Sequence, residues 1–265
     1  MARALTGRHG REDAMDPVIE LRGVTKDYGG GRGVFDLSLA VGRGEVVGFL
    51  GANGAGKSVT MRLFMGFVRP DAGSVSIGGL DCFARHAAIQ GRVGYLPGEL
   101  ACPADLTGAA FLDFMAALRG ASDRRRRDEL TAFFELDPRA RIRSLSKGNR
   151  QKLGIVAAFM GAPDVLLLDE PTSGLDLLMQ RRFVELVRAE RERGATVLLS
   201  SHVLGEVEGI CDRAVFIRRG RLSSETPAAD LTLDATLERL YGADALDRHW
   251  EAPAEPASPE KGGPR

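Results

Sequence analysis

The sequence predicts an α/β fold with a mainly parallel sheet, a small antiparallel β part and an inserted helical subdomain. Apolar runs such as 45–50 and 165–168 alternate with helix-like segments, and runs of this kind are typical of buried parallel strands. A glycine-rich turn joins the first of these runs to a helix. From about residue 99 to residue 150 helical patterns dominate, which predicts a helical subdomain inserted into the core.

The individual elements are expected from apolar spacing and turn chemistry. Strands are expected at 18–21, 45–50, 74–77, 165–168 and 195–200, with a late hairpin at 215–222 around Arg219-Gly220. Helices are expected at 57–65, across 105–140, and from an N-cap at Ser146 to a stop at Gly161 and Pro163. In the long helical segment the apolar residues recur at helical spacing: Phe111, Phe114, Met115 and Leu118.

The ends of the chain differ in composition from its centre. Residues 1–16 show no periodicity and are expected to form a disordered leader, with Met1 and Met15 both open as the true start. The main domain is expected at 17–225, followed by a C-terminal helical extension at 226–250. Residues 251–265, rich in Pro, Gly and Ala, are expected to form a disordered tail.

Composition and charge exclude several classes of protein. Lys and Arg number 36 and Asp and Glu also number 36, so no net charge draws the chain to nucleic acid or to an anionic membrane. The Arg124–Arg127 run is bracketed by acidic residues, which favours a solvated helix face over a nucleic-acid patch. The apolar runs fall far short of the ~20 residues that span a bilayer, and the N-terminus lacks the apolar stretch of a secretory signal. The 3 cysteines have no metal-binding spacing, which fits a reducing cytoplasm.

The segment 51–58 (GANGAGKS) matches the phosphate-binding loop pattern G-x-x-x-x-G-K-[ST] and lies between an expected strand and an expected helix. Glycines allow backbone N–H groups to surround a phosphate, and the following helix points its positive end there. Lys57 is expected to reach the β- and γ-phosphates, and the Ser58 hydroxyl to bind Mg²⁺. A chance match in a glycine-rich turn is the alternative, and the flanking elements make it remote. The sequence therefore predicts a P-loop nucleotide-binding core whose cradle comprises Gly51, Asn53, Gly54, Ala55, Gly56, Lys57, Ser58 and Val59.

Two carboxylates follow the apolar run 165–168, at the carboxyl end of a strand where α/β sheets bind ligands. Asp169 is expected to orient Mg²⁺, and Glu170 to polarise the attacking water. Two solvated acids at a strand end are the alternative. Their combination with Lys57 favours the catalytic interpretation.

Further motifs in this order resemble those of the ATP-binding-cassette (ABC) ATPases. The segment Leu145–Asn149 (LSKGN) resembles the family signature LSGGQ and precedes Asp169 at the short spacing found in the family. Residues 171–176 (PTSGLD) resemble the D-loop, 200–202 (SSH) the switch histidine, and Tyr28 the aromatic residue that stacks on adenine. The resemblance covers about residues 17–225 and implies the ABC ATPase fold.

The resemblance implies a composite site. Ser146 and Gly148, at a helix start, would bind the γ-phosphate held by a second subunit, so that two ATP molecules lie between two cassettes. Lys57, Glu170 and His202 would be the catalytic residues, with ATP and Mg²⁺ as cofactors, and Asp176 would lie at the dimer interface. Taken one at a time, Ser146 is also explained as an N-cap, His202 as a structural histidine and Tyr28 as a surface side chain.

The sequence departs from the family pattern in three places. Lys147 and Asn149 replace the middle glycine and the glutamine of the signature, which resembles a branch of bacterial export ATPases. Gly98 or Glu99 stands where the family usually has a Mg²⁺-sensing glutamine, and Glu99 is expected to replace that glutamine as a metal ligand. Leu177 replaces a frequent proline after the D-loop.

The resemblance implies the ATP-binding and ATP-hydrolysing subunit of an ABC transporter, an exporter that carries a drug, an antibiotic or a polysaccharide. Its expected partners are a separate transmembrane permease and a second ATPase subunit, in a homodimer, with no nucleic acid. It would lie on the cytoplasmic side of the cell membrane and contact the membrane only through the permease. The alternative is a single-cassette soluble ABC ATPase that acts on a protein complex, as in iron–sulfur assembly.

Overall fold

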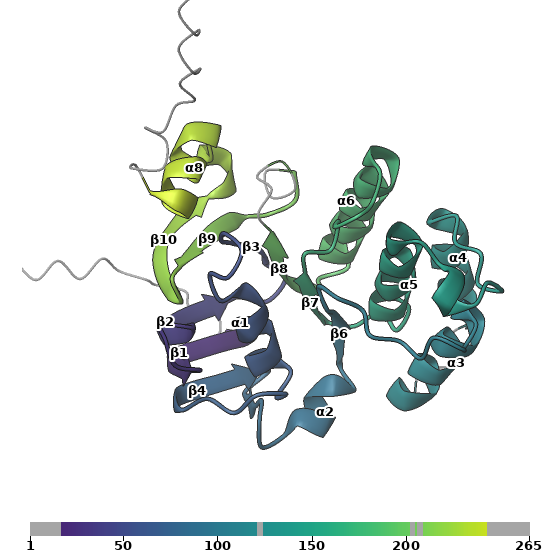
Figure 1. Cartoon of the computed structure of the whole chain (residues 1–265), viewed down its shortest axis with the longest axis horizontal. Coiled ribbons are helices and arrows are strands. Elements are labelled where there is room, and N and C mark those ends of the chain that lie inside the picture. The colour runs from purple at the N-terminus through teal and green to yellow at the C-terminus, as the bar shows by residue number, and fades with distance from the viewer. Residues whose placement is uncertain (1–16, 121–123, 202–204, 206–208, 243–265) are drawn as a thin grey trace, which may run out of the picture.

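The computed structural model describes residues 17–120, 124–201, 205 and 209–242 (Figure 1). Two sheets organise this part of the chain. Five strands of the larger sheet run parallel, in the order β9-β3-β8-β7-β6, and β10 adds an antiparallel edge beside β9. The smaller sheet is antiparallel, in the order β2-β1-β4-β5. The predicted α/β fold, mainly parallel with a small antiparallel part, is confirmed.

The strands occupy the following residues. The antiparallel sheet contains β1 (Ile19–Asp27), β2 (Gly33–Val41), β4 (Ala72–Ile77) and β5 (Leu80–Asp81). The larger sheet contains β3 (Val46–Leu50), β6 (Val93–Leu96), β7 (Val165–Asp169), β8 (Thr196–Ser201), β9 (Arg213–Arg218) and β10 (Arg221–Pro227).

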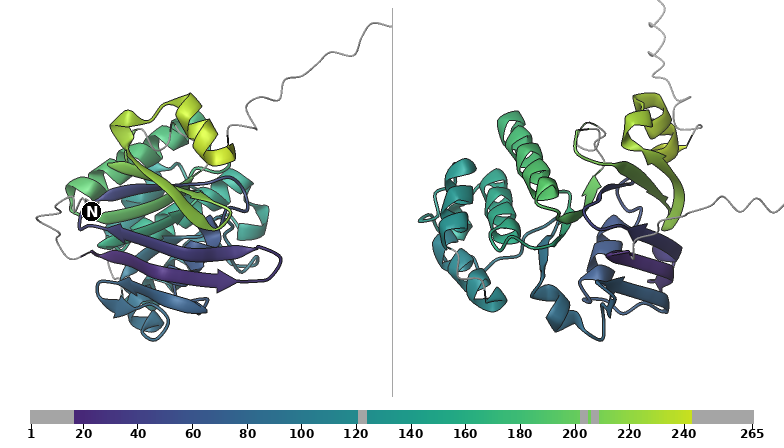
Figure 2. Two further views of the ribbon diagram at one scale, coloured as in Figure 1. Left: turned by 90° about the vertical axis from the view of Figure 1, so that its left-hand side faces the viewer. Right: turned by 180° about the vertical axis from the view of Figure 1, so that it is seen from behind.

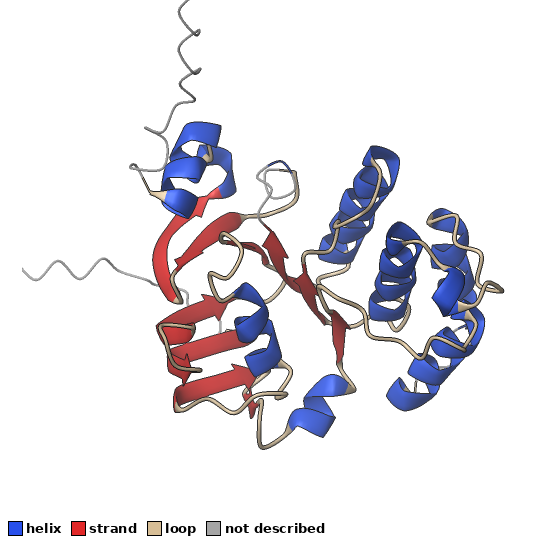
Figure 3. Ribbon diagram, viewed as in Figure 1, coloured by secondary structure: helices blue, strands red, loops and turns tan. Residues whose placement is uncertain are grey.

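Figure 3 distinguishes the helices, in blue, from the strands, in red. The α-helices are α1 (Lys57–Phe64), α2 (His86–Gln90), α3 (Gly108–Arg119), α4 (Arg124–Phe133), α5 (Lys147–Phe159), α6 (Leu177–Glu192) and α8 (Leu233–Tyr241). Short 3₁₀ turns lie at η1 (Ile142–Ser144) and η2 (Ala228–Asp230).

Side-chain oxygens cap four of the helices. The hydroxyl or carboxylate of Thr107, Ser146, Asp176 and Thr232 accepts a backbone N–H bond at the start of α3, α5, α6 and α8 respectively. Each cap satisfies an N–H group that the helix itself leaves without a partner. The predicted N-cap at Ser146 is confirmed, with Asn149 N 3.2 Å from its hydroxyl oxygen.

The core divides along the larger sheet. Strand β7 is buried at all five positions; Leu166 and Leu168 belong to the apolar cluster under α5 and α6, whereas Val165 and Leu167 belong to the cluster around α1. Because successive side chains of a strand point to opposite faces, the apolar side chains of β7 pack into both clusters, one on each face of the sheet. The helix α1 lies between the two sheets (Figures 1 and 2). The helices α3, α4 and α5 lie together on the side of the molecule opposite the antiparallel sheet. No helix in the described part of the chain has the length and apolar character needed to cross a bilayer.

The long helical segment expected at 105–140 is wrong in extent. Helix α3 ends at Gly120, which adopts the left-handed conformation at φ 62°, and α4 ends at Phe133. A left-handed glycine stops a helix because it redirects the chain, and Pro138 further along lacks the N–H that a helix requires. The apolar stripe on α3 is only half buried, since Phe111 is 6% exposed but Leu118 is 65% exposed.

The arginine run at the start of α4 was expected to face solvent, and this holds for only two of its members. The side chains of Arg124 and Arg125 are 76% and 85% exposed. By contrast Arg127 pairs with Asp113 at 2.5 Å, and Arg126 pairs with the buried carboxylate of Glu190. Two arginines of the run therefore attach α4 to neighbouring helices instead of contacting only water.

The Glu190 carboxylate joins three parts of the fold. Its side chain is 2% exposed and pairs with Arg126 from α4 and with Arg193 Nη2 at 2.8 Å. Arg126 also donates to the carbonyl of Phe159 at the end of α5, 3.0 Å away. A buried carboxylate with two guanidinium partners is neutralised locally, and loss of the carboxylate leaves both cations without their charge partner.

We predict that Glu190→Ala lowers the free energy of unfolding by about 2–3 kcal/mol, somewhat below the ~3–5 kcal/mol of a fully buried pair because both guanidiniums are partly exposed. Glu185→Ala is the matched control, since this residue lies on the same helix and pairs with Arg181 at the surface. The control should change stability by less than about 1 kcal/mol. Urea unfolding followed by circular dichroism measures both, and equal losses would contradict the assignment.

Candidate functional site

The loop from the end of β3 to α1 surrounds the start of a helix that no side chain caps. The residue at the N-cap of α1 is Gly56, which has no side-chain oxygen to accept a hydrogen bond from the first N–H groups of the helix. In α3, α5, α6 and α8 a side-chain oxygen occupies this position. Uncapped N–H groups and the positive end of the helix dipole bind anions, so the local structure fits a phosphate.

Glycine is required at two positions of this loop by the space around them. Gly56 has φ 115°, and a Cβ there would lie 2.9 Å from Val34 Cγ1. Gly51 has no room either, because its Cβ would lie 2.7 Å from Ile217 Cγ2. Side chains of β2 (Val34) and β9 (Ile217) therefore leave no room for a Cβ at these two positions of the loop. This packing explains why the sequence motif has glycine there.

Lys57 extends inside the loop and is 6% exposed. Its ammonium donates to the carbonyl of Gly51 at 2.5 Å and forms an ion pair with Glu170 Oε1 at 3.0 Å. The structure thus brings together two of the residues predicted to be catalytic, from segments far apart in the chain. The lysine holds the loop closed and carries a positive charge at its centre.

The two predicted carboxylates lie at the carboxyl end of β7 and differ in environment. Asp169 is 3% exposed and accepts a hydrogen bond from the Ser200 hydroxyl at 2.5 Å. Glu170 adopts φ 49°, a left-handed conformation that is uncommon for a residue with a side chain. Its N–H donates to Ser200 Oγ and Ser200 O, at 3.1 and 3.2 Å, so the neighbouring strand β8 holds this conformation.

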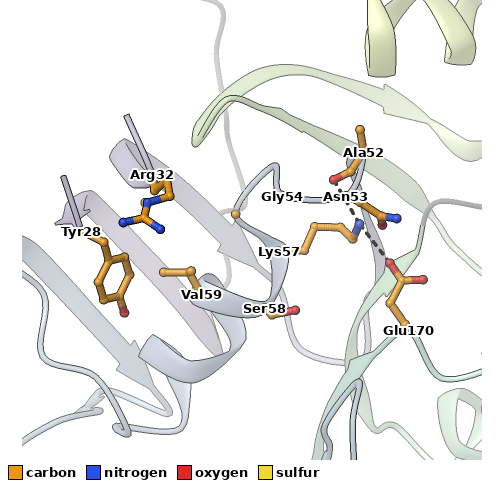
Figure 4. A pocket seen from close by; sticks show the side chains of 11 residues that line it. Tyr28, Arg32, Ala52, Asn53, Gly54, Lys57, Ser58, Val59 and Glu170 are labelled. Carbon is orange, nitrogen blue, oxygen red and sulfur yellow. Dashed lines mark hydrogen bonds and ion pairs between the residues drawn. The ribbon is translucent and has the colours of Figure 1, made fainter. Parts of the chain in front are cut away.

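These elements border a cavity of about 350 Å³. Figure 4 shows Lys57, Ser58 and Glu170 toward one end and Tyr28, Arg32 and Val59 toward the other. The residues that line the cavity are Tyr28, Arg32, Gly33, Ala52, Asn53, Gly54, Gly56, Lys57, Ser58, Val59 and Glu170. A cavity with a cationic end and an aromatic end has the chemistry needed for the phosphates and the base of a nucleotide.

The ring of Tyr28 has a fixed neighbour. The ammonium of Lys26 lies 5.7 Å from the ring centroid, and the same ammonium pairs with Asp71 Oδ1 at 2.7 Å. The ring itself is 46% exposed. It is therefore supported by a cation that is itself anchored, while much of its surface remains available for stacking.

Some predicted site residues lie outside this cavity. Ser146 and Gly148, at the start of α5, are not among its lining residues, and Ser146 is exposed. Glu99 is exposed, and its neighbour Gly98 is the residue that faces Asp169, with a Cβ placed on Gly98 only 3.3 Å from Asp169 Oδ2. The role of Glu99 as a metal ligand stays a prediction. His202 lies outside the described residues.

Two residues at the site, Arg32 and Gln151, were not predicted from the sequence. Arg32 lines the cavity beside Gly33, and its position after a run of three glycines between two strands was the available signal. Gln151 is 5% exposed and donates to the carbonyls of Glu170 at 3.2 Å and Pro171 at 2.8 Å. A single amide within a buried helix gives no pattern that identifies such a partner.

Tyr95 on β6 lies near the carboxylates. Burial, together with the negative charge of Asp169, raises the pKa of the Tyr95 hydroxyl to about 12, against a smaller opposing effect of Arg62. The hydroxyl therefore stays protonated at neutral pH.

Comparison with known proteins agrees with this geometry. The model of the ABC transporter family matches residues 34–173. The chain is 33% identical over 216 residues to the bacitracin transport ATP-binding protein BcrA of Bacillus licheniformis, covering 80% of this chain and 71% of that protein. The chain belongs to the ABC transporter family. The predicted resemblance is confirmed, and the protein is an ABC ATPase, an ATP-binding cassette of the kind that serves transporters.

Further relatives of this ABC ATPase are known from sequence and structure. The daunorubicin/doxorubicin resistance ATP-binding protein DrrA of Streptomyces peucetius is 37% identical over 238 residues, which cover 87% of this chain and 72% of DrrA. The solved structure of an ATP-binding subunit of an ABC transporter superposes with TM-score 0.77 at 29% identity, covering 83% of this chain and 97% of that one. The dimeric cassette MJ0796 shares the fold, with TM-score 0.72 at 22% identity over 79% of this chain and 98% of that one.

The close packing around the loop 51–58 leads to a prediction about nucleotide binding. We expect Gly56→Ala to abolish nucleotide binding, because its Cβ would contact Val34 in a backbone conformation that alanine rarely adopts. Gly54→Ala is the matched control: this glycine also has positive φ (81°), but a Cβ there would meet nothing within 4 Å. Its effect should be limited to backbone strain of about 1 kcal/mol. Titration with a fluorescent ATP analogue measures both variants, and equal affinities would contradict the packing argument.

Proposed function

We propose that this ABC ATPase forms a homodimer around two Mg²⁺–ATP and drives a separate permease that exports a drug-like or antibiotic compound. The main support for ATP hydrolysis is the ion pair of Lys57 with Glu170. It lies at the carboxyl end of the sheet, beside the start of α1, which no side chain caps. The names of the relatives, a bacitracin transport protein and a daunorubicin/doxorubicin resistance protein, support transport and the class of cargo.

The phosphate end of the cavity accounts for hydrolysis. The N–H groups at the start of α1 and the Lys57 ammonium would bind the β- and γ-phosphates and stabilise the charge that develops during transfer. When the γ-phosphate binds Lys57, the Glu170 carboxylate is released from part of its ion pair and can accept a hydrogen bond from the attacking water. His202, which follows β8 in the sequence, is proposed to contact the γ-phosphate.

A divalent cation would be held by Ser58, which lines the cavity, and by Asp169, which directly precedes Glu170 in the chain. The Ser58 hydroxyl and the buried Asp169 carboxylate are hard oxygen donors, and Asp169 is oriented by the hydrogen bond from Ser200. In the described part of the chain no three His, Cys, Asp or Glu side chains gather into a cage, so the remaining ligands would be phosphate oxygens and water. Mg²⁺ bound there would neutralise charge on the phosphates.

The second cassette would complete the site. Ser146 is exposed at the start of α5, and its oxygen accepts the bond from Asn149 N, so its proton remains available to donate. With Gly148 it would bind the γ-phosphate held by the partner, as the resemblance implies. A dimeric solved structure of this fold shows that cassettes of this shape can associate in pairs.

The proposed permease would determine where in the cell the protein acts. We propose that the protein lies on the cytoplasmic side of the membrane and is held there by its permease. The alternative is an ATPase that acts on a soluble complex such as iron–sulfur assembly. Affinity purification from detergent-solubilised membranes separates the two: a membrane protein with several apolar segments of about 20 residues supports transport, and soluble assembly factors alone would support the alternative.

Replacement of the catalytic carboxylate tests the hydrolytic role. We expect Glu170→Gln to reduce kcat at least about 100-fold because the amide cannot accept the proton, while ATP is still bound. The variant should also accumulate as a dimer with ATP and Mg²⁺ in size-exclusion chromatography with light scattering. Glu225→Gln on β10, a carboxylate that pairs with Arg213 away from the cavity, is the control and should keep wild-type turnover. Turnover by Glu170→Gln at the wild-type rate would exclude this role.

The aromatic end of the cavity gives a separate prediction. We expect Tyr28→Ala to raise the KM for ATP about 10-fold, since stacking of one base on an aromatic side chain contributes about 1–3 kcal/mol. Tyr28→Phe retains the ring over Lys26 and should stay within about 2-fold of wild type. Steady-state kinetics with ATP measures both, and an unchanged KM in the alanine variant would show that the base binds elsewhere.

A further inference from the structure

The backbone of Glu170 is held from both sides. Toward β8, its N–H donates to the hydroxyl and the carbonyl of Ser200. Toward α5, its carbonyl accepts from Gln151 Nε2 at 3.2 Å, and the next carbonyl, that of Pro171, accepts from the same amide at 2.8 Å. Both peptide groups of the catalytic residue are therefore fixed by side chains or backbone from other elements.

The hydrogen bonds of Gln151 act on a conformation that needs external support. Glu170 has φ 49°, which costs about 1 kcal/mol or more for a residue with a side chain. Gln151 is 5% exposed, so water does not readily replace its amide. The Glu170 carbonyl also accepts from Ser173 N at 3.2 Å, so loss of the amide would remove one of its donors together with the side-chain donor to Pro171. The direction in which the Glu170 side chain leaves the backbone depends on this conformation.

The start of α5 also touches the loop that follows Glu170. A Cβ on Gly148 would lie 2.7 Å from the carbonyl oxygen of Gly174, so the helix backbone runs directly against this loop. The aliphatic stem of Lys147 also packs against Gly174, with its Cγ and Cδ atoms 3.2 Å from a Cβ placed there. The segment 170–174 thus contacts α5 at its first two residues and again at Gln151.

We propose that Gln151 is a positioning residue that makes the orientation of the Glu170 carboxylate depend on the placement of α5. This rests on the proposed function, in which Ser146 and Gly148 at the start of α5 bind the γ-phosphate of the partner cassette. A γ-phosphate seated on α5 in one composite site then sets, through Gln151, the geometry of Glu170 in the other site. Gln151 touches neither nucleotide and acts only through the backbone of residues 170 and 171.

Replacement of the amide by an apolar side chain of similar size tests the proposal. We expect Gln151→Met to lower kcat at least about 10-fold, because a catalytic group misplaced by about 1 Å costs up to about 100-fold in rate. The KM for ATP should change by less than about 3-fold, since the cavity is lined by other residues. The Hill coefficient for ATP should fall below that of the wild type, because the γ-phosphate in one site would no longer set the geometry of Glu170 in the other.

Gln180→Met is the matched control. Gln180 also donates its side-chain amide to a carbonyl of this region, that of Leu175 at 3.1 Å, but it does not contact Glu170. It should keep kcat within about 2-fold of wild type. An equal loss in both variants, or none in Gln151→Met, would overturn the proposal. Gln151→Asn, which keeps the amide but is one methylene shorter, should also lose turnover, and it replaces Gln151→Met if that variant does not fold.

Dimerisation separates this proposal from the proposed function. In a Glu170→Gln background, Gln151→Met should still bind ATP and still form the ATP-dependent dimer, because the phosphate contacts of α5 are retained. A single Glu170→Gln variant that does not dimerise would contradict the proposed function itself. A double variant that fails to dimerise where the single one succeeds would contradict the positioning role, since Gln151 would then support the interface.

Discussion

The carboxyl end of β7 is the constraint on which the rest of the site depends. Here the chain leaves a strand that is buried on both faces and turns. It presents the Asp169 carboxylate to the Ser200 hydroxyl and the Glu170 carboxylate to Lys57 of the loop. It does so through a left-handed Glu170, a conformation that would not persist without partners. Ser200 on β8 accepts a hydrogen bond from the Glu170 N–H, and Gln151 on α5 donates one to the Glu170 carbonyl. The backbone conformation of Glu170 is therefore held by both β8 and α5.

The parallel topology explains why these parts meet. Strand β7 lies between β6 and β8, and β3 lies beyond β8, so the carboxyl ends of all four strands meet at one edge of the sheet. The loop with Lys57 leaves β3 at that edge, and Asp169 and Glu170 leave β7 there. In open α/β sheets ligands bind outside this edge, which accounts for a site assembled from distant segments.

The structure shows the surroundings of several residues that depart from the family pattern. Lys147 is exposed, and its stem packs over Gly174, so it ties the start of α5 to the loop after Glu170 besides adding a positive charge near the expected phosphate. Gly98 stands against the Asp169 carboxylate, where a side chain would have little room. The segment after β6 therefore approaches the Asp169 carboxylate with its backbone. The adjoining Glu99 is exposed, at the start of the stretch that leads to α3.

The sequence by itself determined the fold class, the phosphate-binding loop and the pair Asp169-Glu170, because each depends on local patterns. Apolar runs identify buried strands, and the glycine spacing of 51–58 reflects a chain path that few sequences adopt. The order of motifs was enough to identify the family, and the N-cap at Ser146 could be read from its neighbours.

Only the tertiary structure decided which distant groups contact one another. Three interactions join segments far apart in the chain: the ion pair of Lys57 with Glu170, the ion pair of Arg126 with the buried Glu190, and the bonds from Gln151 to residues 170 and 171. Nothing in the sequence around Gln151 distinguishes it from a polar residue that faces water. Such contacts are set by how helices pack against the sheet, and packing depends on the whole chain and not on a local pattern.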